Sequence, residues 1–189
     1  NYSSCSGNGS WSNPYVIENV TIDASSSPTG SGILIENSKD VYFIIRNVTV
    51  YNAGSEYYHA GIKLIATKNG NLTNNNCSNN GYYGILLYGN CENNTISGNT
   101  ANDNREDGIV IANGENNTIS NNNVSNNGDR GIYLRNECQN NTISGNTAIN
   151  NWEGICLEIS NNNTVSRNNV SNNNRYGIRI RDSNNNTLS

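Results

Sequence analysis

Residues 114–134 read GENNTISNNNVSNNGDRGIYL and contain seven asparagines among 21 residues. Asparagine favours turns and is depleted from strands, so such a composition is typical of disordered chains. Between the asparagines, however, the apolar residues Ile119, Val124, Ile132 and Leu134 are regularly placed, and most of them are β-branched. The stretch therefore indicates short β-strands separated by frequent turns.

The same pattern repeats along the chain. Each copy opens on the glycine of a tetrapeptide such as GIYL, at Gly61, Gly84, Gly108, Gly131, Gly154 and Gly177. The spacings are 23, 24, 23, 23 and 23 residues. An earlier copy, GILI, begins at Gly32, 29 residues before Gly61, because AGSEYYHA is inserted at about residues 53–60. A fixed period of this length indicates a solenoid.

Within each repeat the apolar residues alternate with a period of two, as Ile132 and Leu134 do, which is the pattern of a half-buried strand. A second short strand is expected around Ile119 and a third around Val124. No segment shows a helical stripe, so a leucine-rich repeat is excluded. An all-β chain with three short strands per 23 residues predicts a right-handed parallel β-helix, with coils stacked ~4.8 Å apart.

The asparagines then occupy defined columns of this solenoid. Counted from the centre of the second strand, they recur at positions −2, +3 and +8. The columns contain Asn94, Asn117, Asn141, Asn163 and Asn186; Asn75, Asn99, Asn122, Asn146 and Asn168; and Asn80, Asn104, Asn127, Asn151 and Asn173. Because asparagine tolerates the left-handed conformation and both donates and accepts hydrogen bonds, we expect three amide ladders at the corners.

The motif G-I-x-L…N-N-T-I-S-x-N resembles the repeats of NosD-like and of carbohydrate-binding and sugar-hydrolase β-helix families. The opening WSNPYVIENVTID, residues 11–23, is similar to the segment that precedes such repeats in archaeal and bacterial surface proteins. The resemblance implies a parallel β-helix over essentially the whole chain, in a fold that hosts lyases, hydrolases, adhesins and accessory proteins. We expect residues 1–31 to form a capping segment and first strands, and residues 32–189 to form the coils, with no evident C-terminal cap.

Composition narrows the function classes. The net charge is −4 and the lysines and arginines are scattered, so a nucleic-acid partner is not expected. The longest apolar run, VYFII at 41–45, is far shorter than the ~18 residues of a membrane span. The chain has five cysteines without a CxxC pair, one histidine and no methionine, so neither a metal cluster nor a copper-delivery role is expected.

Thirteen N-x-S/T sequons fit an extracellular or cell-surface protein that carries glycans. Asn93, Asn116, Asn140 and Asn162 are the candidate sites in the repeats. Cys91 and Cys138 hold the same turn position two coils apart and are a candidate disulfide if their turns arch over the one between. We expect Cys77 to be buried, and Cys5 and the outward-facing Cys156 to lack partners.

One strip beside the first strand combines aromatic and charged residues. Its members are Tyr82, Tyr83, Tyr88, Asp107, Tyr133, Trp152, Glu153 and Tyr176. Aromatic rings beside charged groups suit sugar binding. The interpretation that we favour is a solvated ladder in which Asp107, Arg130 and Glu153 pair across coils without a ligand.

Glu106 and Asp129 are weak catalytic candidates in the same strip. They should lie one coil apart, ~5 Å, which suits a retaining glycosidase pair or, with Asp107, a calcium site. Arg130 is the only residue there that fits the role of a lyase base. Without a shaped cleft, a pair of acids is weak evidence, so we do not expect an enzyme. We expect His59, in the insertion, to be a surface residue.

Two further surfaces remain. The outward residues of the second strand form a Thr/Ser array, but serine lacks the methyl group of ice-binding faces, so ice binding is not expected. The last residues, DSNNNTLS, stop partway through a coil and leave strand edges that invite a second copy of the chain. We therefore predict a non-enzymatic structural or adhesive protein that assembles head to tail into filaments or a surface layer. The alternative is a glycan-binding or polysaccharide-cleaving module.

Overall fold

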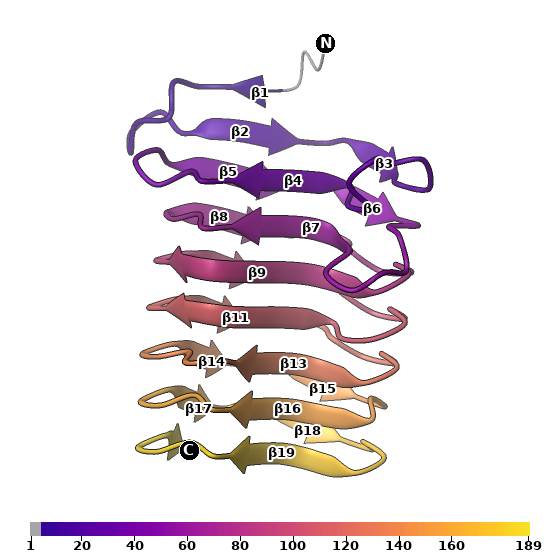
Figure 1. Ribbon diagram of the computed structural model, residues 1–189, viewed down its shortest axis with the longest axis vertical. Coiled ribbons are helices and arrows are strands. Elements are labelled where there is room, and N and C mark those ends of the chain that lie inside the picture. Colours follow the sequence, from indigo (N-terminus) through magenta and orange to yellow (C-terminus); the bar gives the residue numbers. More distant parts are fainter. Residues whose placement is uncertain (1–4) are drawn as a thin grey trace.

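Short parallel strands stacked along one axis make up the protein in the computed structural model, which describes residues 5–189 (Figure 1). The predicted right-handed parallel β-helix of about 23 residues per coil is confirmed. Every pairing between strands is parallel except that of β1 with β2. No helix long and apolar enough to cross a membrane occurs among these residues.

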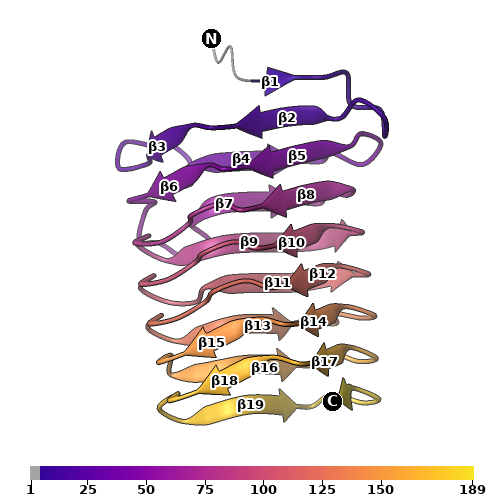
Figure 2. The ribbon, with the colours of Figure 1, turned by 180° about the vertical axis from the view of Figure 1, so that it is seen from behind.

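Two sheets form the two long walls, seen from opposite sides in Figures 1 and 2. The seven-stranded sheet contains β4 (Ile33–Glu36), β7 (Ala60–Ile65), β9 (Tyr83–Glu92), β11 (Ile109–Glu115), β13 (Arg130–Arg135), β16 (Glu153–Glu158) and β19 (Tyr176–Arg181). The nine-stranded sheet contains β1 (Cys5–Ser6), β2 (Tyr15–Glu18), β5 (Phe43–Arg46), β8 (Gly70–Thr73), β10 (Thr95–Ser97), β12 (Thr118–Ser120), β14 (Thr142–Ser144), β17 (Thr164–Ser166) and β20 (Thr187–Leu188).

The third side of the coil is the least regular. It forms two-stranded pairs at each end of the solenoid, β3 (Thr21–Asp23) with β6 (Thr49–Tyr51) and β15 (Thr147–Ile149) with β18 (Asn169–Ser171). In the middle coils it is reduced to single bridges, such as Thr100 with Asn123. The predicted third strand is therefore present, but in the central coils it is only one bridged residue long.

The core is a narrow apolar column inside the coils. In the inner coils the first and second strands contribute inward side chains that are fully buried, as Ile132, Leu134 and Ile119 are. In-register pairing stacks each residue on its equivalent in the next coil, such as Ile109 on Ile132. Because each coil buries only a few apolar side chains, its polar residues must also stabilise the interior.

The three predicted amide ladders supply that stabilisation. In the middle ladder, the side-chain amide of Asn99 donates to Oδ1 of Asn122 at 3.0 Å and to the backbone oxygen of Leu72 at 2.9 Å. The backbone N–H of Asn99 also donates to Oδ1 of Asn122, at 2.8 Å. The same bonds recur in the other two ladders, as at Asn117 and Asn127. Each asparagine thus ties its own coil to the coils on both sides.

The left-handed conformation and the ladder hydrogen bonds belong to different asparagines. This differs from the prediction, in which the ladder asparagines themselves adopt the left-handed conformation. In the pair Asn116–Asn117 the first residue has φ 55° and is exposed, whereas the second is buried and lies in the ladder. The pairs Asn121–Asn122 and Asn126–Asn127 repeat this arrangement. The Asn-Asn dipeptides of the sequence therefore each encode one turn and one rung of a ladder.

The glycine that opens each repeat is required by close packing. A Cβ on Gly108 would lie 2.7 Å from the backbone oxygen of Gly131 and 2.9 Å from Nδ2 of Asn127. The third ladder therefore passes so close to the start of the first strand that only glycine fits there.

The structure does not form the suggested disulfide between Cys91 and Cys138. Both thiols are free and buried. Each donates to a backbone oxygen of the preceding coil, Cys91 to that of Leu64 and Cys138 to that of Ile111. Gly114 lies in the coil between them. Two coils separate their backbones by ~9.6 Å, beyond the reach of a disulfide. Cys77 is buried, as predicted.

Candidate functional site

The outer face of the seven-stranded sheet differs from an ordinary solvated face. The third residue of the GIxL tetrapeptide, the x, points outward from the coil. It is apolar in four successive coils, as Leu86, Val110, Tyr133 and Cys156. All four are buried, with exposed fractions of 8% or less. Tyr133 and Cys156 point outward from the coil as expected, but neither reaches solvent.

The insertion explains part of this burial. Residues 54–59, here called the strap, lie between β6 and β7 and place Tyr57 and Tyr58 on the outer face. Tyr58 packs against Tyr88 of β9 with ring centroids 4.8 Å apart, and Tyr57 packs edge-on against Tyr82 at 5.8 Å. Tyr82 in turn contacts Tyr83 at 4.5 Å. Five tyrosines therefore form one continuous aromatic cluster on the part of the face around β9.

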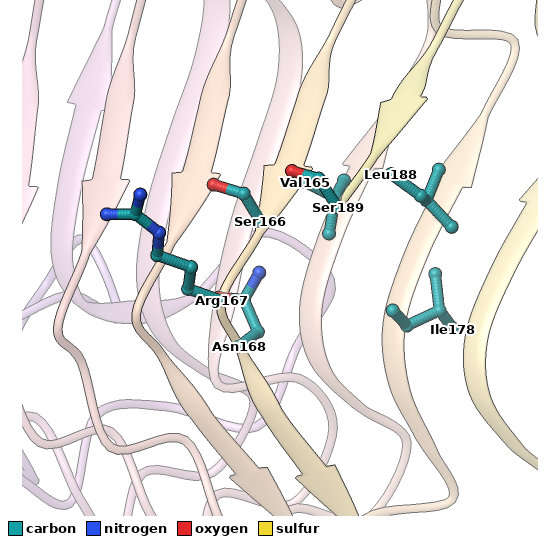
Figure 3. Close-up of a pocket in the computed structure, with 7 residues that line it drawn as sticks. All are labelled: Val165, Ser166, Arg167, Asn168, Ile178, Leu188 and Ser189. Carbon is teal, nitrogen blue, oxygen red and sulfur yellow. The ribbon is translucent and has the colours of Figure 1, made fainter.

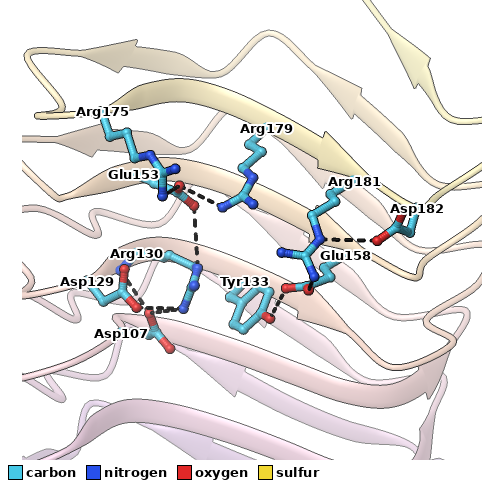
Figure 4. A network of polar contacts seen from close by, with 10 residues as sticks. All are labelled: Asp107, Asp129, Arg130, Tyr133, Glu153, Glu158, Arg175, Arg179, Arg181 and Asp182. Atoms are coloured by element: carbon cyan, nitrogen blue, oxygen red, sulfur yellow. Dashed lines mark hydrogen bonds and ion pairs between the residues drawn. The ribbon is translucent and has the colours of Figure 1, made fainter.

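The part of the face near β13, β16 and β19 carries a network of carboxylates and arginines (Figure 4). Glu153 at the start of β16 is 1% exposed and lies 2.9 Å from Nη1 of Arg179, 3.5 Å from Nη1 of Arg175 and 3.5 Å from Nε of Arg130. Arg130 also pairs with Asp129 at 2.6 Å. Three guanidinium groups therefore share one buried carboxylate.

A second branch of the network reaches the far end of the strands. The hydroxyl of Tyr133 donates to Glu158 at 2.5 Å, and Glu158 pairs with Arg181 at 2.8 Å. The guanidinium of Arg130 lies 4.1 Å from the centre of the Tyr133 ring and joins the two branches. Burial raises the pKa of the Tyr133 hydroxyl, so it acts as a hydrogen-bond donor at physiological pH.

Asp107 is the most perturbed acid of the face. It is 3% exposed, and Oδ1 accepts the backbone N–H of Arg130 at 2.7 Å. Burial raises the pKa of this carboxyl to about 7, although the positive charge of Arg130 opposes the shift. Asp107 is therefore protonated over most of the acidic range and partly charged near neutrality.

The raised pKa of Asp107 predicts a pH-dependent stability. The folded chain keeps this proton up to about pH 7, whereas an unfolded chain with a pKa near 3.8 has lost it. Raising the pH from 4 to 7 therefore destabilises the fold, by about 4 kcal/mol at most. We expect Asp107→Asn, which keeps the Oδ1 acceptor, to equal the wild type in stability at pH 4 and to exceed it at pH 8. Urea unfolding at both values checks this, and a constant difference between the two proteins would contradict it.

Two of the candidate catalytic residues, Asp129 and Arg130, occupy this network. Backbone hydrogen bonds place Glu106 and Asp129 in adjacent coils, as predicted. Burial alone would lower the pKa of Arg130, but Asp107 and Asp129 raise it above its usual range. This shift argues against Arg130 as a base. Among residues 5–189 no group of three histidine, cysteine or acidic side chains is arranged to hold a metal ion.

The residues of the predicted strip divide into two groups. Tyr88, Trp152 and Tyr176 are exposed by 37%, 47% and 44%, whereas Tyr83, Asp107, Tyr133 and Glu153 are buried. Tyr82 is half-buried. Sequence reasoning placed the insertion at the edge of the strip but did not name Tyr57 or Tyr58 as site residues, although the run of apolar outward residues in four repeats signals that something covers them. Five of the eight arginines lie on this face, where they pair with or lie close to carboxylates.

The candidate glycosylation sites lie on another surface. Asn93, Asn116, Asn140 and Asn162 are exposed, and each occupies the left-handed corner that precedes the second strand. They form one column with a spacing of one coil. Their modification stays a prediction.

A hollow of about 380 Å³ lies at the last coil (Figure 3). Val165, Ile178 and Leu188 line it, together with residues 166–168 and Ser189. The three apolar residues occupy the inward positions of the repeat. The hollow is therefore part of the stacking surface of a coil and not of the outer face.

Comparison with solved structures shows the same architecture. The chain is similar to the A-module of the mannuronan C-5 epimerase AlgE4 from Azotobacter vinelandii, with a TM-score of 0.74 at 18% identity, over 93% of this chain and 55% of that one. It is also similar to the periplasmic alginate epimerase AlgG, with a TM-score of 0.74 at 19% identity, over 93% and 45%. A third similar structure is the enzymatically active domain of tailspike protein 2 from bacteriophage CBA120, with a TM-score of 0.66 at 14% identity, over 92% and 31%.

These likenesses are of fold alone, and the chain spans about half or less of each of those proteins. No curated protein matches the sequence significantly. The profile of the right-handed beta helix region matches residues 31–189, which begin just before GILI and include all later repeats. With its stacked parallel coils and its matching repeats, the chain belongs to the right-handed β-helix family.

Proposed function

We propose that the outer face of the seven-stranded sheet binds a polysaccharide. The observation that carries this proposal is the exposure of Tyr88, Trp152 and Tyr176 on one face, beside arginines that are already fixed in place by ion pairs. Exposed aromatic rings stack on the apolar faces of sugars, and neighbouring charged groups hydrogen-bond to their hydroxyls. The arginines need little reordering on binding, which lowers the entropic cost.

The length of the face suits a chain-like ligand. The stacked positions of Tyr83, Asp107, Arg130, Glu153 and Tyr176 belong to five successive coils. The coils of Tyr83 and Tyr176, at the two ends of the face, are therefore ~19 Å apart along the axis, which is long enough for several sugar rings. The similar structures support the choice of ligand, because two of them are named as epimerases of alginate or mannuronan.

The proposed activity is binding rather than bond cleavage. Asp107 and Glu153 are buried, and Asp129, Glu153 and Glu158 are paired with arginines. A general acid or base must reach the substrate, and these groups instead hold the face together. We infer a location outside the cytoplasm, where polysaccharides are met, which the periplasmic AlgG structure supports. The predicted head-to-tail assembly is a separate prediction that negative-stain microscopy checks.

Removal of an exposed ring tests the proposal. We expect Trp152→Ala and Tyr176→Ala each to weaken polysaccharide binding about tenfold, since one stacked aromatic contributes about 1–1.5 kcal/mol. Affinity electrophoresis in gels that contain alginate, polygalacturonate or neutral glucans measures this. Trp11→Ala is the matched control, because Trp11 is 78% exposed and lies between β1 and β2, which are strands of the other sheet.

Two results would contradict the proposed function. One is that the wild type migrates identically with and without every polysaccharide. The other is that Trp11→Ala weakens binding as much as Trp152→Ala. Release of oligosaccharides from any of these polymers, lost in Glu106→Gln, would show that the face cleaves rather than binds.

A further inference from the structure

Arg135, at the end of β13, is the residue on which the strap rests. Its Nη1 donates to the hydroxyl of Tyr57 at 2.6 Å, a contact between residues 78 apart in the sequence. The guanidinium also lies 5.4 Å from the ring centre of Tyr57 and 5.7 Å from those of Tyr58 and Tyr133. Arg135 is thus held among three tyrosine rings at the centre of the outer face.

The other edge of this guanidinium has no partner. Nε and Nη2 of Arg135 are buried, and no described residue accepts a hydrogen bond from them. A buried donor without an acceptor is destabilising, because it has lost its hydrogen bonds to water and gained none in the protein. Nε and Nη2 lie on the same edge and form the planar fork that matches the two oxygens of a carboxylate. The unsatisfied edge therefore has the geometry of a carboxylate-binding group.

The strap that covers Arg135 is strained at its tip. Tyr58 has φ 70°, a left-handed conformation that is unfavourable for a bulky residue. Such strain persists only where the surroundings impose it, and it is frequent at ligand clamps. Tyr57 is 50% exposed, and its hydroxyl accepts the hydrogen bond from Arg135.

The base of the strap is fixed, in contrast to its tip. The His59 ring lies against Gly30 and Gly54, where an added Cβ would come within 2.3 and 2.4 Å of the ring. Nδ1 of His59 also accepts the backbone N–H of Glu56 at 3.2 Å. The tip of the strap is held by side-chain contacts on the outer face and not by the backbone of the coils, so it can move without disturbing them.

We propose that Arg135 is the carboxylate-recognising residue of the polysaccharide face, and that an acidic sugar reaches its free Nε–Nη2 edge when the strap, which the Tyr57 hydroxyl holds at Nη1, moves aside. The ligand class is then a carboxylated polysaccharide, such as a polyuronate. This inference rests on the proposed function and specifies its ligand. A carboxylate satisfies the Nε and Nη2 donors together, which a neutral sugar hydroxyl does not. Displacement of Tyr57 also releases the strain at Tyr58.

The experiment compares polygalacturonate with its fully methyl-esterified form, which has the same backbone without the charge. Calorimetric titration of the wild type is expected to show at least tenfold tighter binding of the acid. Arg135→Gln is expected to bind the acid no better than the ester. Arg135→Lys, which keeps the charge but not the fork, is expected to recover only part of the preference. Tyr57→Phe, which removes the hydrogen bond that holds the strap on Arg135, is expected to bind the acid several-fold more tightly than the wild type.

A second readout needs no ligand. Hydrogen exchange at residues 54–59 is expected to be faster in Tyr57→Phe than in the wild type, while exchange in β13 stays the same. Equal exchange in the two proteins would overturn the role given to Tyr57.

The outcomes separate the two proposals. If the wild type prefers the acid and Arg135→Gln keeps that preference with an unchanged unfolding midpoint, Arg135 is not the recognising residue and the proposed function stands. Tighter binding of dextran sulfate than of polygalacturonate overturns the choice of carboxylate. If the wild type binds neither form of the polymer nor any other polysaccharide, the proposed function itself is wrong.

Discussion

Replacement of Asn122 by alanine is expected to lower the free energy of unfolding by about 4 kcal/mol. Asn122 is 2% exposed and lies in the middle amide ladder. Its Nδ2 donates to the backbone oxygen of Ile96 and to Oδ1 of Asn146, both at 2.9 Å, while its Oδ1 accepts the backbone N–H of Asn99 at 2.8 Å. The truncation removes all of these bonds, and each buried polar group that is left without a partner costs roughly 1–3 kcal/mol.

Asn123→Ala is the matched control for that experiment. Asn123 is the next residue in the chain, and its exposed side chain accepts a hydrogen bond only from the hydroxyl of Ser125. We expect a loss within about 0.5 kcal/mol, as for most surface changes. Chemical denaturation followed by circular dichroism measures both variants. Equal losses for Asn122→Ala and Asn123→Ala would show that the buried ladder adds nothing beyond what an exposed asparagine does.

Glu153→Gln is expected to destabilise the protein by about 3 kcal/mol. The buried Glu153 carboxylate is shared by Arg130, Arg175 and Arg179. Glutamine keeps the shape and one acceptor but removes the negative charge, so these guanidinium groups lose their shared counter-ion. Loss of one partner of a buried ion pair is costly because the remaining charge stays partly desolvated.

Glu115→Gln provides the comparison for Glu153. Glu115 is exposed, and its carboxylate forms no ion pair with a described residue. Thermal unfolding of the two variants at the same ionic strength is expected to show a clear fall in Tm for Glu153→Gln and almost none for Glu115→Gln. If the two unfold at the same temperature, the arginine network is a solvated surface feature, as the sequence interpretation favoured.

The regular part of the structure could be predicted because each feature is repeated. The glycine spacing gives the coil length, and the alternation around Ile132 and Leu134 gives the inward face. The three asparagine columns follow from the same alignment. The separation of corner and ladder roles could also have been found, since the pairs Asn116–Asn117 and Asn121–Asn122 recur at the same places. The asparagines occur in pairs because the first residue of each pair forms the turn and the second places its buried amide in the ladder.

The outer face could not be predicted to the same depth, because it depends on a segment that occurs once. Period-two alternation marks Tyr133 and Cys156 as outward, but their exposure depends on what covers the sheet. The strap's path, and with it the contact of Tyr57 with Arg135, has no equivalent in other repeats. The raised pKa of Asp107 likewise results from burial, which its sequence neighbours do not signal. The disulfide suggestion was wrong because it required the turns to bulge away from a regular stack.

The near-identity of the coils has a consequence for how such a protein can evolve. Each coil presents the same in-register edge to the next, and the amide ladders continue through every junction from Asn94 to Asn163. In-frame duplication of a single 23-residue unit would therefore insert without a mismatch and lengthen the molecule by ~4.8 Å. Duplication or deletion of whole units therefore changes the length of the protein in steps of one coil, while the insertion that carries Tyr57 stays where it is.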